Sequence, residues 1–98
     1  MAEIIAEVRQ LDYQKDTKHG RLGILGERTP TEIGMHALRA GDAIGEHTVI
    51  FGTLGERLEL TYRASTRAAY ASGALKAAYW LQNQDNGLYD MQDVLALR

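Results

Sequence analysis

The sequence predicts an α+β fold in which a three-stranded antiparallel meander packs against helices. Two stretches with a helical spacing of apolar residues, 1–11 and 66–82, lie on either side of three stretches in which apolar and polar residues alternate. Short turns that contain glycine separate these three stretches, which favours antiparallel neighbours. A chain of 98 residues can bury one modest core, so we expect a single domain over residues 1–98.

The composition is that of a folded protein and excludes several classes of function. Hydrophobic residues make up 45% and charged residues 24%, and a net charge of −2 gives no electrostatic support for binding nucleic acid or an anionic membrane. The absence of cysteine excludes disulfides and thiolate sites. The start MAEIIAEVRQ carries two glutamates where a signal peptide would be basic, and no segment has the length of a bilayer-spanning helix. We therefore expect a cytoplasmic protein with no nucleic-acid or membrane partner.

The first predicted element is a short amphipathic helix over residues 1–11. Glu3 and Glu7 stand in its early turns, where the helix dipole favours acidic groups. Its apolar side chains recur at helical spacing, and they are Ile4, Ile5, Val8 and Leu11.

Residues 12–32 are interpreted as a long loop, because the periodicity fades there and the segment holds the only proline, Pro30. Its glycines, Gly20, Gly23 and Gly26, form a G-x-x-G-x-x-G pattern. This pattern is a weak signal for a phosphate-binding loop, since we expect no strand before it and no helix after it, and no Lys-Ser or Lys-Thr follows.

Three strands are predicted at about residues 33–39, 46–52 and 56–63. Alternation divides the side chains of the second and third strands between two faces. One face, which we expect to be buried, carries His47, Val49, Phe51, Leu58, Leu60 and Tyr62. The other face is mixed and carries Thr48, Ile50, Glu59, Thr61 and Arg63.

Two more helices are predicted after the strands. The helix over residues 66–82 is rich in alanine and carries a row of small residues four apart, Ala69, Gly73 and Ala77, which would let it lie close against a sheet. The segment QNQDNG ends it, with Gly87 expected at a positive φ. A short last helix follows, with Asp90 as its cap. Apolar residues of this tail that need cover are Val94, Leu95 and Leu97.

The best candidate for a binding site is the junction between the third strand and the helix, Ser65, Thr66 and Arg67. Ser65 or Thr66 can cap the helix, while the remaining N–H groups and the positive end of the dipole can hold an anion. Arg67 could add a bidentate grip on a carboxylate. The alternative is an ordinary cap beside a solvated arginine, and capping residues are common enough at helix starts to favour it on spacing alone.

Other chemistry-bearing residues give weaker signals. His19, His36 and His47 show no metal-ligand spacing, and we expect His47 to be a half-buried histidine with its hydrogen bonds satisfied. Carboxylates on exposed strand positions seldom form a paired acid–base site, although Glu46, Glu56 and Glu59 would be the members of one here. We predict no metal site and no catalytic residue from these groups.

Five motifs, in this order, resemble the C-terminal domain of bacterial 4-hydroxy-tetrahydrodipicolinate reductases, also called dihydrodipicolinate reductases. They are R-A-G-D-x-x-G-E-H, G-E-R-L-E-L-T, A-S-x-R, G-A-x-x-A-x-x-W-L and G-L-Y-D-M. The matching run covers about residues 27–96, and the leading helix and glycine-rich segment resemble the family more loosely. The resemblance implies a role in lysine (diaminopimelate) biosynthesis.

The resemblance also implies which parts of the enzyme this chain carries. Its A-S-x-R element makes Ser65, Thr66 and Arg67 one wall of a pocket for a cyclic dicarboxylic acid, which is a small ligand of the kind a helix N-terminus and an arginine can hold. The family's H-H-x-x-K-x-D and S-G-T stretches and its dinucleotide-binding (Rossmann) domain have no counterpart here. We therefore expect no catalytic residue and no cofactor in this chain, the NAD(P)H of the full-length family being bound elsewhere.

Two function classes follow. In the first, the chain is the substrate-binding and tetramerisation domain of a reductase and is not catalytic alone. In the second, it is a free-standing paralogue that acts as an oligomerising or dicarboxylate-binding module. Because the family's sheets associate across subunits, and because an incomplete sheet leaves an open edge, we expect a homodimer or homotetramer in either case.

Overall fold

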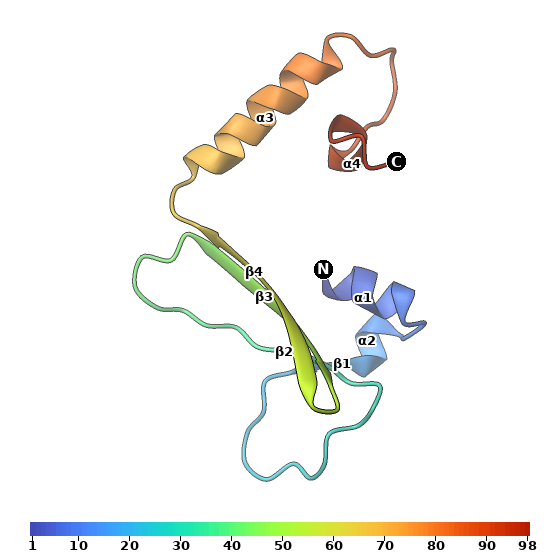
Figure 1. Cartoon of the computed structure of the whole chain (residues 1–98), viewed down its shortest axis with the longest axis vertical. Helices are drawn as coiled ribbons and strands as arrows, with labels where there is room; N and C mark the ends of the chain where they lie inside the picture. The colour runs from blue at the N-terminus through green and yellow to red at the C-terminus, as the bar shows by residue number, and fades with distance from the viewer. The chain divides into compact units, whose positions relative to one another are not determined.

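The computed structural model describes all 98 residues, and they form two compact units, Met1–Ala40 and Gly41–Arg98. Figure 1 shows the helices and strands of each unit along the chain. Helices and short sheets occur together, so the predicted α+β class is confirmed. No helix is long and apolar enough to cross a bilayer.

The first unit begins with helix α1, Ala2–Val8, as predicted. It ends in a Schellman motif: Gln10 takes a φ of 57°, its N–H donates to the Glu7 carbonyl, and the Leu11 N–H donates to the Ala6 carbonyl at 2.8 Å. A left-handed glutamine is uncommon, and these two hydrogen bonds are what hold it there.

The prediction of an unbroken loop over residues 12–32 is wrong, because this segment contains helix α2, Tyr13–Asp16, and strand β1, Thr17–His19. The Asp12 side chain caps α2 by accepting from the Lys15 N–H at 3.0 Å. A four-residue helix and a three-residue strand are too short to produce a detectable period.

The strand arrangement differs from the predicted meander. Strand β2, Ile33–Met35, is shorter than the predicted first strand and pairs in parallel with β1, with Thr17 opposite Ile33. It makes no sheet with the next two strands. The Gly20 N–H donates to the Met35 carbonyl and extends this pairing, so one edge of β2 is paired within the first unit.

The small core of the first unit lies where α1, β1 and β2 begin or end. Its buried residues are Ala6, Thr17, Glu32 and Ile33. Glu32 forms an ion pair with Arg21, which explains how a carboxylate is accommodated there.

The second unit holds the hairpin of strands β3, Gly45–Thr53, and β4, Glu56–Ala64. The antiparallel pairing and the division into two faces are as predicted. Val49 lies opposite Leu60 on the apolar face, and Thr48 lies opposite Thr61 on the mixed face, with their hydroxyl oxygens 3.0 Å apart. Gly55, with a φ of 80°, completes the two-residue connection between the strands.

The expectation that the apolar face is buried is wrong for this unit. Phe51 is 40% exposed, Leu58 58% and Leu60 57%, and no residue of helix α3, Ala68–Leu81, is buried. The row of small residues on α3 therefore covers no sheet. This face of the hairpin remains open to a second surface.

Helix α3 ends at Leu81, close to the predicted end. Gly87 does not take the expected positive φ. It instead makes room for the ring of Tyr89, whose atoms lie 3.1 Å from the position a Cβ at Gly87 would occupy. That ring packs edge-on against Trp80, with ring centroids 5.2 Å apart, and so ties the tail to α3.

Helix α4, Met91–Val94, begins at Asp90, the predicted cap, and forms a capping box with Asp93. Arg98 donates to both carboxylate oxygens of Asp93, at 3.0 and 3.1 Å, and lies 2.9 Å from Asp90. The hydrogen bonds from Arg98, and then the Asp90 backbone N–H, lower the pKa of Asp93 below its ordinary value of 3.8.

Replacing Arg98 with alanine is expected to raise the pKa of Asp93 toward 3.8 and to fray α4. Because the folded-state pKa is lowered, the stabilisation by the Asp93 carboxylate is complete above 3.8 and is lost as the pH falls through the lowered pKa. An NMR pH titration of the Asp93 carboxyl carbon measures this. Arg57→Ala, which removes a different surface ion pair, is the control, and an Asp93 pKa unchanged by Arg98→Ala would contradict the prediction.

Candidate functional site

Ser65, Thr66 and Arg67 form the connection between β4 and α3. The expected side-chain cap from Ser65 or Thr66 does not form: the N-cap residue is Arg67, and no side chain caps the helix. The Thr66 hydroxyl instead accepts from the Ala68 N–H at 3.2 Å, two residues on, in a local turn before the helix. Arg67 occupies the N-cap position with a helical backbone, and its carbonyl accepts from the N–H groups of Tyr70 and Ala71. The helix thus begins directly after the strand, as the sequence predicted.

This junction has hydrogen-bond donors without a partner in the chain. In the first turn of α3 the Ala69 N–H donates no hydrogen bond within the chain. The Arg67 side chain is exposed and forms no ion pair, whereas Arg63, four residues earlier, pairs with Glu46 at 3.4 Å. An N–H group at the positive end of a helix and an unpaired guanidinium both suit a carboxylate ligand.

The histidines are distributed differently from the sequence expectation. His47 is exposed rather than half-buried, because the apolar face on which it lies opposite Tyr62 is uncovered. The parallel pairing of β1 with β2 brings His19 and His36 to one shallow recess of the first unit. The sequence could not show this proximity, since the two residues come from separate segments. No three His, Asp or Glu side chains come together in an arrangement that could hold a metal ion.

The glycine-rich segment has a strand before it, contrary to the sequence expectation, because β1 ends at His19. Gly20, Gly23 and Gly26 all have positive φ values, of 69°, 69° and 77°. The segment leads into β2 rather than into a helix, so no helix N-terminus faces it. Its geometry does not form the phosphate cradle that requires a strand, a glycine loop and a helix in succession.

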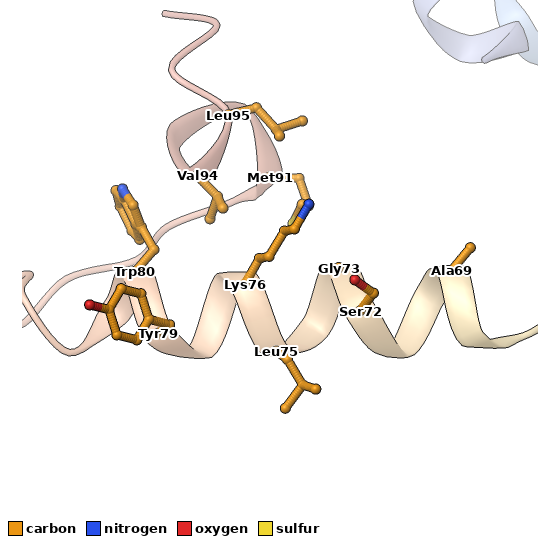
Figure 2. A pocket seen from close by; sticks show the side chains of 10 residues that line it. All are labelled: Ala69, Ser72, Gly73, Leu75, Lys76, Tyr79, Trp80, Met91, Val94 and Leu95. Atoms are coloured by element: carbon orange, nitrogen blue, oxygen red, sulfur yellow. The ribbon is translucent and has the colours of Figure 1, made fainter.

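Sequence reasoning missed an open groove between α3 and α4. Figure 2 shows Met91 and Val94 of α4 beside α3, with Trp80 at one end and Leu75 pointing away from α4. The groove has a volume of about 630 Å³ and is mostly apolar. The sequence did contain a sign of this groove, namely the apolar residues of the tail that were expected to pack against another element. Val94 is partly buried in the groove, while Leu95 and Leu97 remain 59% and 69% exposed.

Comparison with known proteins identifies relatives over the whole chain. The family model "Dihydrodipicolinate reductase, C-terminus" matches residues 1–95. Among curated relatives, the 4-hydroxy-tetrahydrodipicolinate reductase of Akkermansia muciniphila is 53% identical over 97 residues, covering 99% of this chain and 39% of the relative. Those of Syntrophus aciditrophicus and Geotalea uraniireducens are each 53% identical over 98 residues, covering 100% of this chain and 37% of the relative. The chain therefore spans little more than a third of the length of these relatives.

Proposed function

This chain belongs to the family of dihydrodipicolinate reductase C-terminal domains, and from that membership we propose that it is the substrate-binding and tetramerisation domain of a 4-hydroxy-tetrahydrodipicolinate reductase. Such an enzyme would use NAD(P)H in lysine (diaminopimelate) biosynthesis in the cytoplasm. The cofactor would be bound outside these 98 residues, and this chain would contribute part of the wall for a cyclic dicarboxylate.

The observation that carries the proposal is the unpaired Arg67 beside the free N–H of Ala69, at the A-S-x-R motif. One carboxylate of the substrate would accept hydrogen bonds from both groups, and the adjacent Ser65 hydroxyl could donate a third. These contacts bind and orient the substrate, since an arginine fork fixes the plane of a carboxylate. No proton or hydride is transferred by this element.

These contacts alone should give weak binding. Charge-assisted hydrogen bonds contribute about 1.5 to 3 kcal/mol each, so two or three of them, opposed by the entropy lost on association, give a Kd of about 1 mM or weaker. An affinity in this range is measurable by NMR titration.

We expect pyridine-2,6-dicarboxylate to shift the backbone amide signals of residues 65–69, and Arg67→Ala to abolish these shifts. A two-dimensional amide titration of the 98-residue chain measures this. Arg63→Ala is the matched control, because Arg63 is also an exposed arginine near the junction but is paired with Glu46. If Arg67→Ala leaves the shifts unchanged, Arg67 is a solvated arginine at an ordinary helix start, and the assignment of this junction as a substrate wall fails.

A further inference from the structure

Tyr70, in the first turn of α3, reaches back to the end of the hairpin from which the helix departs. Its hydroxyl oxygen lies 2.7 Å from the position that a Cβ at Gly45 would occupy. Gly45 is the first residue of β3 and pairs with Ala64, the last residue of β4. A Cβ at position 45 would require the end of the Tyr70 side chain to move, so this arrangement depends on both residues.

Tyr70 also affects the ionisation of a tyrosine on the hairpin. A side-chain hydrogen bond with Tyr70, followed by desolvation, raises the pKa of Tyr62 above its ordinary value of 10.0. Tyr62 lies on β4 two residues before Ala64. Tyr70 therefore lies against Gly45 of β3 and influences Tyr62 of β4, near the end of the hairpin that leads into Ser65, Thr66 and Arg67.

Little else fixes the direction of α3 relative to the hairpin. No residue of α3 is buried, and the hydrogen bond from the Ala68 N–H to the Thr66 hydroxyl joins residues only two apart. The direction of α3 determines where the Ala69 N–H points and where the Arg67 side chain starts. A contact that sets this direction would therefore set the geometry of the proposed substrate wall, which is formed by Arg67 and the Ala69 N–H.

We propose that Tyr70 is a positioning residue of this wall: through Gly45 and Tyr62 it holds the start of α3 at the angle that aims the Ala69 N–H and Arg67 at one carboxylate. The proposal rests on the proposed function for its ligand, while the positioning itself is a property of the chain without ligand. It accounts for a glycine at position 45, where the backbone has no positive φ that would require one.

Two variants of the full 98-residue chain test the contact from its two sides. Tyr70→Phe removes the hydroxyl and keeps the ring. Gly45→Ala places a methyl group where the hydroxyl lies and displaces the end of the Tyr70 side chain. Tyr79→Phe, an exposed tyrosine on the same helix, and Gly52→Ala, where a Cβ meets nothing within 4 Å, are the matched controls.

The first readout needs no ligand. Residual dipolar couplings of the backbone amides should show a changed angle between α3 and the hairpin in both variants and in neither control. In Tyr70→Phe the phenol of Tyr62 should titrate closer to 10.0 than in the unmodified chain. Unchanged couplings in both variants would overturn the proposal, whatever happens to ligand binding.

The second readout connects the angle to the site. With pyridine-2,6-dicarboxylate as the probe, both variants should weaken binding by about three- to tenfold. This is the loss in affinity expected when about one hydrogen bond to the ligand is misaligned. If the unmodified chain does not bind this probe, the proposed function fails and the dipolar couplings alone decide the positioning role. If the couplings change while affinity stays constant, Tyr70 orients the helix but not the wall, and the proposal is overturned.

Discussion

The 98-residue chain, mixed with the reductase substrate and NADH or NADPH, is expected to give no turnover. Hydride transfer requires a nicotinamide held against the substrate, and the glycine-rich segment, which leads from β1 into β2, does not have the strand, loop and helix that bind a dinucleotide phosphate. The role proposed for the junction at residues 65–67 is to bind a carboxylate, not to transfer a proton or a hydride. Because enzymes accelerate reactions by about 10⁶-fold or more, the difference from a complete reductase should be unmistakable.

The informative control is a chimera. Replacing the C-terminal part of the Syntrophus aciditrophicus reductase, which is 53% identical to this chain, with these 98 residues should give NAD(P)H-dependent turnover. Turnover by the isolated chain would contradict the first expectation. A folded but inactive chimera would favour the alternative of a free-standing paralogue, which binds or assembles without catalysis.

The sequence predicted the local features of the second unit well, because each rests on a local cause. The alternation through Val49 and Leu60 defines the two hairpin faces, and Gly55 supplies the turn. Asp90 caps α4 as expected, since a side-chain cap requires only the neighbouring N–H groups. These interactions span a few residues and are visible as spacing.

The features that could not be predicted depend on contacts between distant segments. The parallel pairing of Thr17 with Ile33 joins two three-residue strands across a connection with no periodic pattern. Likewise, the approach of Tyr70 to Gly45 depends on the angle between a helix and a hairpin. The position of Ser65, Thr66 and Arg67 at a strand–helix junction was predictable, whereas the unpaired state of Arg67 required knowledge of which arginines find partners.

In solution the chain is expected to form a homodimer or homotetramer at tens of micromolar, because the hairpin exposes an apolar face that its own helices do not cover. Four residues on this face have exposed fractions between 40% and 58%, namely Phe51, Leu58, Leu60 and Tyr62. Burying apolar surface contributes roughly 25 cal/mol per Å², so a few hundred Å² on each partner supply several kcal/mol before the entropic cost of association. Open strand edges favour the same outcome.

Leu60→Lys is expected to shift the chain toward the monomer, because it places a charge at the centre of the apolar face, opposite Val49. Thr61→Lys, at the next position and on the mixed face, is the matched control, and dissociation by this variant as well would show that both faces take part in assembly. Sedimentation equilibrium or light scattering over a concentration series measures the mass directly. An unmodified chain that stays monomeric at tens of micromolar would contradict the prediction, because the exposed apolar face would then be stable in water without a partner.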